Sequence, residues 1–270
     1  MAENEQERGK RRRQRMLFDD IAADYDTYRL GYPQEIVESV IGLARLGAGS
    51  DVLEVGCGTG QLTESLAGRG FRLTAIDIGP SLIDTARRRL EGTGVSFQVT
   101  SFEDLAADDA SFDLIVSGAA YHWVDPQVRF SKPARLLRPG GWLALLGYDE
   151  RYDDPVGAAL LAMWTARSDA VAAPWAGPQE PADADAIGAS GWFEAPVTRT
   201  ASDRLVLPAE SVIRIENTRA TVLSWPPETR ERFLTELAGH LSSRPEVPLT
   251  RLSWVTMARL APRPSSAAPA

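Results

Sequence analysis

The chain has 270 residues, a formal net charge of −8 at pH 7 and a pI near 5.0. This length can hold one α/β domain with an added subdomain, and the acidic balance argues against a nucleic-acid-binding surface. Cys57 is the single cysteine, which excludes an intrachain disulfide. Apolar runs are shorter than the roughly 20 residues of a membrane span, and the polar N-terminus lacks a signal-peptide core. We therefore expect a cytoplasmic protein, monomeric or homodimeric, with neither a membrane nor a nucleic acid as partner.

Residues 1–15 are rich in basic side chains, set against three glutamates. Such a segment is either a nucleic-acid-binding arm or a solvated chain end, and we favour a disordered tail. A tyrosine-rich stretch follows at 18–32. Pro33 then begins a helix whose apolar residues share one face. These residues are Ile36, Val37, Val40, Ile41 and Ala44.

The stretch 51–66 has the pattern of a strand, a glycine turn and a helix. Val52, Leu53 and Val55 form a short apolar run typical of a buried strand. Glycines at the alternate positions 56, 58 and 60 allow a sharp turn and a close approach of the backbone to a ligand. Apolar residues at helical spacing follow. The pattern predicts the first βα unit of a nucleotide-binding sheet.

The glycine loop differs from the dinucleotide pattern G-x-G-x-x-G, because Gln61 stands at the last glycine position. Glu54 precedes the loop and would bring a carboxylate to the place of a pyrophosphate, where a cation fits better. About twenty residues further on, a second predicted strand ends at Asp77. An acid at this position accepts hydrogen bonds from ribose hydroxyls. The loop therefore favours a nucleoside ligand that carries a positive charge over NAD.

With these features the sequence resembles the class I S-adenosylmethionine-dependent methyltransferases, whose glycine loop reads E/D-x-G-x-G-x-G. The resemblance covers about residues 16–150 well and the rest loosely. It implies an α/β, Rossmann-like sheet of seven mostly parallel strands, the last one antiparallel, with a helical lid insertion. It also implies S-adenosyl-L-methionine as cofactor. The residues that it assigns to this cofactor here are Tyr28, Arg29, Glu54, Gly56, Cys57, Gly58, Gly60, Asp77 and Ile78, with Tyr32 assigned to the substrate.

A third strand is predicted at 95–99, and the family contacts adenine just after it. We expect Ser101, Phe102 and Glu103 to line the cofactor site there, with the Phe102 ring along the adenine. Many relatives carry an aspartate where this chain has Ser101, so a side-chain contact to the adenine amine is in doubt at this position. A backbone contact at Phe102 requires no particular side chain.

A fourth strand is predicted at 112–117, and its end should lie at the carboxyl edge of the sheet, where open α/β folds bind ligands. We assign Ser117 to the cofactor site. His122 is the catalytic candidate, and Tyr121 and Trp123 beside it are candidates for shaping the substrate pocket. The alternative for His122 is a purely structural role.

Residues 150–192 are alanine-rich, with prolines and tryptophans, and indicate a helical lid over the edge of the sheet. A sixth strand is expected at 196–207, after a fifth at 142–146, and a last strand at 251–260. Arg219 is a candidate anchor for an acidic substrate. The expected organisation is a disordered tail at 1–15, an α/β core at 16–149, a lid with the sixth strand at 150–225, the last core helix and strand at 226–260, and a disordered tail at 261–270.

Several classes of methyltransferase are excluded because the sequence lacks the residues that their reactions need. Cytosine-5 methylation needs a cysteine nucleophile, and Cys57 lies in the cofactor loop. The segment after the fourth strand lacks the Asn/Asp-Pro-Pro-aromatic motif of adenine methylation. Ribose methylation uses a catalytic lysine, and the chain has only Lys10, in the N-terminal tail, and Lys132, which argues against that reaction. A metal-dependent site needs clustered acids, which Asp125 alone does not provide, so we expect no metal.

The chain is most similar to the trans-aconitate-methyltransferase-like and biosynthetic members of the family. The sequence thus predicts methyl transfer to a small-molecule acceptor, with an oxygen favoured as the acceptor atom, as in secondary metabolism. A second hypothesis is a homologue that binds the cofactor but catalyses a cyclisation or rearrangement without methyl transfer.

Overall fold

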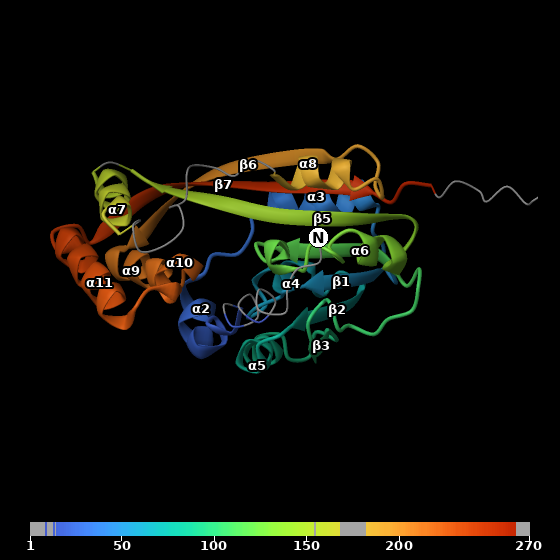
Figure 1. Ribbon diagram of the computed structural model, residues 1–270, viewed down its shortest axis with the longest axis horizontal. Helices are drawn as coiled ribbons and strands as arrows, with labels where there is room; N and C mark the ends of the chain where they lie inside the picture. The colour runs from blue at the N-terminus through green and yellow to red at the C-terminus, as the bar shows by residue number, and fades with distance from the viewer. Residues whose placement is uncertain (1–8, 10–12, 14, 154, 168–181, 263–270) are drawn as a thin grey trace, which may run out of the picture.

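The computed structural model describes residues 9, 13, 15–153, 155–167 and 182–262 (Figure 1). Most of the basic N-terminal segment, the middle of the expected lid (168–181) and the end of the expected C-terminal tail (263–270) lie outside the described residues. Among the helices of the described ranges, none is both long and apolar enough to cross a bilayer.

Seven strands form one sheet in the order β3-β2-β1-β4-β5-β7-β6 (Figure 1). Strands from β3 to β5 pair in parallel, whereas β7 pairs antiparallel with both β5 and β6. The expected Rossmann-like sheet with its antiparallel last strand is confirmed. The strands are β1 (Asp51–Val55), β2 (Arg72–Asp77), β3 (Ser96–Val99), β4 (Phe112–Gly118), β5 (Leu137–Tyr152), β6 (Val197–Pro208) and β7 (Glu246–Arg259).

Helices cover both faces of the parallel half of the sheet, because successive side chains of a strand point to opposite sides. In β1, Val52 packs with the helices α3 and α4, whereas Leu53 packs with α6 and α8. The carboxyl edge of the parallel strands therefore remains as the place for a ligand. The bounds are α3 (Gln34–Ala44), α4 (Gln61–Leu66), α5 (Pro80–Arg89), α6 (Ser131–Leu136) and α8 (Ala182–Ala189).

Strand β5 is much longer than the predicted segment 142–146. It continues to Tyr152 and stays paired with β7, whose Leu249 lies opposite Tyr152. Strand β6 extends alongside, with Pro208 opposite Glu246. The three strands thus form a ribbon that projects beyond the parallel half of the sheet (Figure 1).

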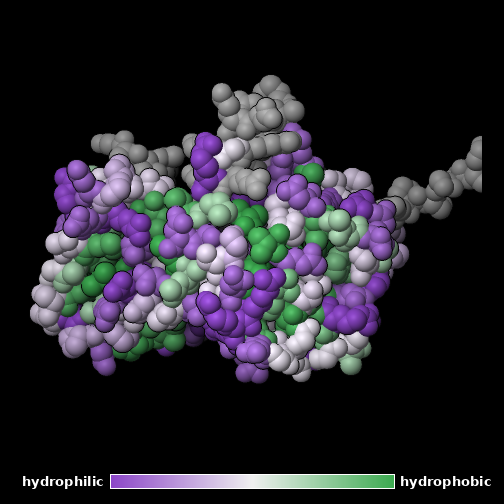
Figure 2. Space-filling view, turned by 90° about the horizontal axis from the view of Figure 1, so that it is seen from below, coloured by the Kyte–Doolittle hydropathy of each residue, from purple (hydrophilic) through white to green (hydrophobic). Residues whose placement is uncertain are grey.

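A group of helices packs on the projecting end of this ribbon, and we call it the cap: α7 (Val156–Thr165), α9 (Ala209–Asn217), α10 (Ala220–Ser224) and α11 (Pro227–Leu241). Its core contains the rings of Trp164, Trp225 and Phe233, which meet in tilted and edge-to-face contacts. In the view from below, hydrophobic residues reach the surface over the cap and again near the middle of this face (Figure 2).

The cap differs from the expected lid in two helices. Helix α11, expected in the core, belongs to the cap because it connects the projecting ends of β6 and β7. Helix α8, expected in the lid, instead packs on the sheet through the buried Ile187. Helices α11 and α8 therefore exchange the places that the sequence predicted for them.

A glycine at the first loop position is required by the fold. Gly56 has φ +73°, and a Cβ there would lie 2.5 Å from the Cβ of Ala120. We expect Gly56→Ala to lower the free energy of unfolding by about 1–3 kcal/mol, because backbone strain and overpacking combine. Urea denaturation measures this. The control is Gly239→Ala in α11, where a Cβ meets no atom within 4 Å, and which should be neutral or stabilising by up to about 1 kcal/mol. Equal stabilities of the two variants would contradict the prediction.

Candidate active site

The glycine loop after β1 lies against the end of β2. The backbone N–H groups of Gly56 and Cys57 both donate to the carbonyl of Ile76, at 2.9 and 3.0 Å. Gly58 has φ +56°, and a Cβ there would lie 3.6 Å from the Tyr25 ring. These contacts fix the loop at the carboxyl edge of the sheet, with open space above it.

Asp77 ends β2 and binds the glycine loop directly. Its Oδ2 accepts a hydrogen bond from the Gly58 N–H at 2.9 Å, and its Oδ1 accepts one from the Gly79 N–H at 3.0 Å. Burial raises the pKa of the Asp77 carboxyl, and these backbone donors oppose the shift. A carboxylate has about four acceptor sites, so Asp77 retains capacity for a ligand's hydroxyl groups.

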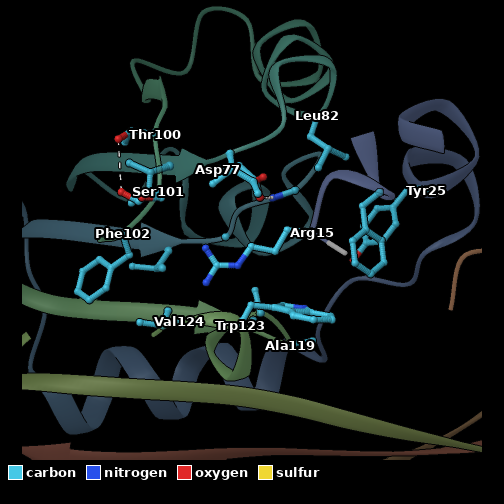
Figure 3. Close-up of a pocket in the computed structure, with 18 residues that line it drawn as sticks. Arg15, Tyr25, Asp77, Leu82, Thr100, Ser101, Phe102, Ala119, Trp123 and Val124 are labelled. Atoms are coloured by element: carbon cyan, nitrogen blue, oxygen red, sulfur yellow. Dashed lines mark hydrogen bonds between the residues drawn. The ribbon is translucent and has the colours of Figure 1, made fainter. Parts of the chain in front are cut away.

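Asp77 lines a cavity whose volume is about 690 Å³ including its open mouth. We call it the Asp77 cavity (Figure 3). Ile78, Ser101 and the Phe102 segment contribute to its wall. The Phe102 ring itself turns away into the core, where it packs against Tyr121. The expectation that this ring lies along a ligand ring is therefore wrong, and the backbone supplies the wall here.

A second cavity, the Glu54 cavity, lies on the other side of the glycine loop. Arg29, Tyr32, Cys57 and Tyr148 line it together with Glu54. Glu54 is 1 % exposed, and its Oε2 has no hydrogen-bond partner. Burial raises the pKa of Glu54 to about 8, with a smaller contribution from Asp77 and an opposing one from Thr63. The cavity therefore holds a buried acceptor that a cationic group would satisfy.

Arg29 connects this cavity to the cap. Its guanidinium donates to the Tyr148 hydroxyl and to the carbonyl of Thr218, each at 3.0 Å, and lies over the Tyr25 ring. Its buried Nε has no hydrogen-bond partner. The side chain thus carries a positive charge without a carboxylate bonded to it, and an anionic group of a ligand fits there.

A third and larger cavity, the Glu150 cavity, lies between the ribbon and the cap. Its volume is about 1490 Å³ including open space. Tyr148, Glu150 and Tyr152 line one side of it, at alternate positions of β5, and Trp164 of α7 lines another. This cavity exists because β5 continues past the parallel strands.

The three cavities meet at two residues. Tyr25 of α2 (Ala22–Tyr28) and Ala119, just after β4, line all of them. Ala119 has φ +52°, a conformation that is uncommon for a residue with a Cβ. Its N–H donates to the carbonyl of Leu146 at 2.8 Å, which holds the strained turn. Such strain is typical of functional sites.

His122 lies in a short helical turn, η2 (Tyr121–Trp123), and lines the Glu150 cavity. The residue is exposed at the cavity surface, while protein surrounds the ring elsewhere. This desolvation, with the positive charges of Arg129 and Arg15, lowers the pKa of His122 to about 4. The imidazole is therefore neutral near pH 7 and can accept a hydrogen bond.

Several predicted residues lie outside the cavities. Gly60 is the N-cap of α4 and packs against Leu90 and Ala86 of the α5 region. The Ser117 hydroxyl donates to the carbonyl of Val55 at 2.7 Å and links two strands. Tyr28 lies beside Arg214 at the surface.

Tyr121 and Glu103 also have structural contacts. The Tyr121 ring is buried, and its hydroxyl donates to the carbonyl of Arg129 at 2.6 Å. Glu103 pairs with Arg15 at 3.0 Å and accepts a hydrogen bond from the Asp125 N–H. Both residues position the segment around His122 rather than line a cavity.

Arg219 does line the Glu150 cavity, but carboxylates already surround it. Its Nε donates to Glu216 at 2.7 Å and its Nη2 to Glu150 at 3.0 Å. Burial lowers the pKa of Arg219, but Glu216 and Glu150 outweigh this and raise it well above its ordinary value. An arginine paired in this way is a poor anchor for an acidic substrate.

Sequence reasoning missed several lining residues. Arg15, assigned to the disordered tail, has helical backbone and reaches across the Asp77 cavity to Glu103 (Figure 3). Phe18 was missed as well and lines two cavities, whereas Tyr25, which lines all three, is one of the tyrosines that the family resemblance places near the cofactor. The tyrosine-rich composition of their segment was the available signal. No signal in the sequence indicated Tyr148 and Glu150, because the length of β5 could not be predicted from it.

Comparison with known proteins agrees with this geometry. Residues 53–145 match the family model described as a methyltransferase domain. Over 129 residues the chain is 38 % identical to a malonyl-[acyl-carrier protein] O-methyltransferase of Hahella chejuensis, covering 47 % of this chain and 46 % of that protein. Over 102 residues it is 47 % identical to a ubiquinone biosynthesis O-methyltransferase of Xanthomonas axonopodis pv. citri, covering 36 % and 43 %. The matches thus span about half the length of these curated relatives or less.

The whole fold also has a solved counterpart. The structure of a putative type II methyltransferase from Anaeromyxobacter dehalogenans superposes with a TM-score of 0.62 at 25 % identity, covering 88 % of this chain and all of that one. The likeness therefore extends well beyond residues 53–145.

The pKa of Glu54 predicts how stability depends on pH. The folded pKa of about 8 exceeds the ordinary 4.5. Between these values the folded protein holds a proton that the unfolded chain releases, so stability falls as the pH rises, by about 1.4 kcal/mol per pH unit at most. Glu54→Gln removes the titrating group and therefore this loss of stability at high pH. Its melting temperature should exceed that of the wild type at pH 9, and the difference should shrink towards pH 5.

The control for this measurement is Glu91→Gln, which changes an exposed carboxylate and should show no such pH dependence. A Glu54→Gln shift of the same size at pH 5 and pH 9 would show that Glu54 does not titrate in this window.

Proposed function

Because residues 53–145 match a methyltransferase domain, we propose that the protein is a class I S-adenosylmethionine-dependent enzyme that transfers a methyl group to a small-molecule acceptor, with a hydroxyl oxygen as the acceptor atom. The observation that carries this proposal is the junction of the three cavities at Tyr25 and Ala119. Two of them flank the glycine loop, and the third is a separate, larger space of mixed apolar and polar lining. A donor and an acceptor can therefore meet at one point.

The residues at the glycine loop fit S-adenosylmethionine. Asp77 would bind the ribose hydroxyls, since its oxygens face the Asp77 cavity beside Gly58. The Oε2 of Glu54, which has no hydrogen-bond partner, matches an ammonium, and the Arg29 guanidinium, whose Nε has no hydrogen-bond partner, matches a carboxylate. An amino acid end group carries both charges. Each charged end thus has a complementary group in the Glu54 cavity.

When bound, S-adenosylmethionine supplies a methyl group activated by its sulfonium, so catalysis consists mostly of positioning and desolvation. Tyr25 and Trp123 form the walls around the junction and exclude water from it. His122 would accept the hydroxyl proton as the acceptor oxygen forms its new bond to carbon. The two O-methyltransferase relatives support oxygen as the acceptor atom.

The assay for this function uses methyl-deuterated S-adenosylmethionine and a panel of phenols and alcohols. The expected result is formation of S-adenosylhomocysteine together with a deuterated methyl ether, detected by mass spectrometry. A product without the label and without S-adenosylhomocysteine would instead support the non-methylating cyclisation or rearrangement. Calorimetric titration with NAD and S-adenosylmethionine distinguishes an oxidoreductase, and failure of S-adenosylmethionine to bind would overturn the proposal.

Asp77→Ala tests the cofactor site. Removal of a hydrogen-bonded charged group should weaken S-adenosylmethionine binding by roughly 1.5–3 kcal/mol, as measured by isothermal titration calorimetry. Asp84→Ala is the control, because Asp84 is an exposed carboxylate on α5 paired with Arg87 at 3.0 Å, and it should bind the cofactor as the wild type does. Equal affinities of the two variants would remove Asp77 from the site.

His122→Ala tests the proton acceptor. General base catalysis contributes typically 10²–10⁴ in rate, and the lowered pKa makes this imidazole a weak base, so we expect kcat to fall by about 10²-fold. Because the pKa is about 4, the His122-dependent part of the wild-type rate should be constant from about pH 5 upward and lost only nearer pH 4.

The control is His240→Ala, which removes the other histidine, on α11. It should leave kcat unchanged. A His122→Ala variant that keeps its kcat and only raises KM would make His122 a substrate contact rather than a base.

A further inference from the structure

A buried carboxylate on the wall of the Glu150 cavity lacks a full set of partners. The Glu150 side chain is 1 % exposed, yet it lines the cavity at the middle of the row Tyr148, Glu150, Tyr152. Its Oε2 accepts a hydrogen bond from Arg219, whereas its Oε1 has no hydrogen-bond partner. An unsatisfied buried acceptor is costly, so a donor supplied by a ligand would be strongly favoured.

We propose that the Glu150 cavity binds an acceptor that carries a protonated amine, and that Oε1 of Glu150 holds this amine while a hydroxyl of the same molecule faces the junction. The proposal rests on the proposed methyl transfer and adds the chemical class of the acceptor: an apolar alcohol or phenol with an amine as its recognition group.

The charges on the cavity wall favour a cation over a neutral donor. Arg219 is shared by two buried carboxylates, Glu150 and Glu216. The Tyr152 hydroxyl adds a neutral hydrogen bond to Glu216 at 3.3 Å. Among these hydrogen-bonded groups one positive charge is shared by two negative ones, and Arg29 in the same cavity donates its hydrogen bonds to Tyr148 and Thr218 instead of to either carboxylate. An ammonium at Oε1 of Glu150 would complete the pairing. A neutral alcohol would donate the hydrogen bond to Oε1 but would supply no positive charge.

The other arginines of the cavity are engaged elsewhere. Arg151 pairs with Asp149 at 3.0 Å, and Arg29 donates to Tyr148 and to the carbonyl of Thr218. Neither arginine donates a hydrogen bond to Glu150 in these contacts, although the charge of Glu150 contributes to raising the pKa of Arg29. A carboxylate on the acceptor would therefore meet Glu150 and Glu216 at close range, and like charges at a buried site are strongly disfavoured.

The remaining walls suit an apolar body between the two polar ends. Leu160, Leu161 and Trp164 of α7 line the cavity, and Phe18 and Trp123 line it on the core side. Leu161 is 62 % exposed despite its apolar side chain. Aromatic faces also attract ammonium groups. The cavity thus combines apolar contact area with one charged recognition point.

The test uses three small probes of similar shape: phenethylamine, phenethyl alcohol and phenylacetate. Each is titrated calorimetrically into protein saturated with S-adenosylhomocysteine. A charged hydrogen bond predicts that the amine binds roughly tenfold or more tightly than the alcohol, and that the carboxylate binds more weakly than either. A wild type that binds the alcohol as tightly as the amine, prefers the carboxylate, or fails to bind the amine would overturn the proposal.

Glu150→Gln should abolish the preference for the amine over the alcohol while S-adenosylhomocysteine still binds. Glu210→Gln is the control, because Glu210 is an exposed carboxylate on α9, and it should keep the preference. A Glu150→Gln variant that retains the preference would overturn the proposal. If this variant does not fold, the order of the three probe affinities for the wild type still tests the proposal. Failure of S-adenosylhomocysteine to bind the wild type would contradict the proposed function itself, which separates the two outcomes.

Discussion

The antiparallel pairing of β5 with β7 is the constraint on which the site depends. The pairing begins at Trp142 opposite Arg259, inside the core, and continues to Tyr152 opposite Leu249, beyond the parallel strands. The backbone hydrogen bonds of this ladder continue along the whole pairing, so the three strands of the ribbon support one another beyond the ends of the parallel strands. The cap packs on this end, and the Glu150 cavity is the space that remains between cap and core.

The N-terminal segment joins the two halves of the site. Tyr25 lines all three cavities, and Arg29 bonds both to Tyr148 on β5 and to the Thr218 carbonyl between two cap helices. On the core side, Oδ1 of Asp19 accepts a hydrogen bond from the Leu82 N–H at the start of α5 at 3.0 Å. A segment that precedes the sheet in the chain therefore couples the cofactor side to the acceptor side.

Both ends of the site contain buried acceptors without partners, Oε2 of Glu54 and Oε1 of Glu150. Each lowers the stability of the free protein, because a buried polar group loses its hydration without replacement. The same groups need no rearrangement to bind a donor. The structure thus gives up stability at two points in exchange for preorganised binding, a trade-off common at functional sites.

The sequence by itself determined the half of the site that is built from local contacts. Glu54 and Asp77 lie on the adjacent strands β1 and β2, which one helix connects, and the glycines at 56, 58 and 60 directly follow β1, so spacing alone predicts that these residues meet. The parallel core and its antiparallel last strand were implied by the family resemblance that these residues carry. The tertiary structure alone decided the Glu150 cavity, because its contacts join residues far apart in the chain: Arg219 meets Glu150 across 69 positions, and Arg29 meets Tyr148 across 119.

The direction of side chains could not be predicted from the sequence either, since burial in the core turned the rings of Phe102 and Tyr121 away from the cavities. Local patterns encode strand, turn and helix, whereas pairing of distant charges and the length of the ribbon depend on the packing of the whole chain.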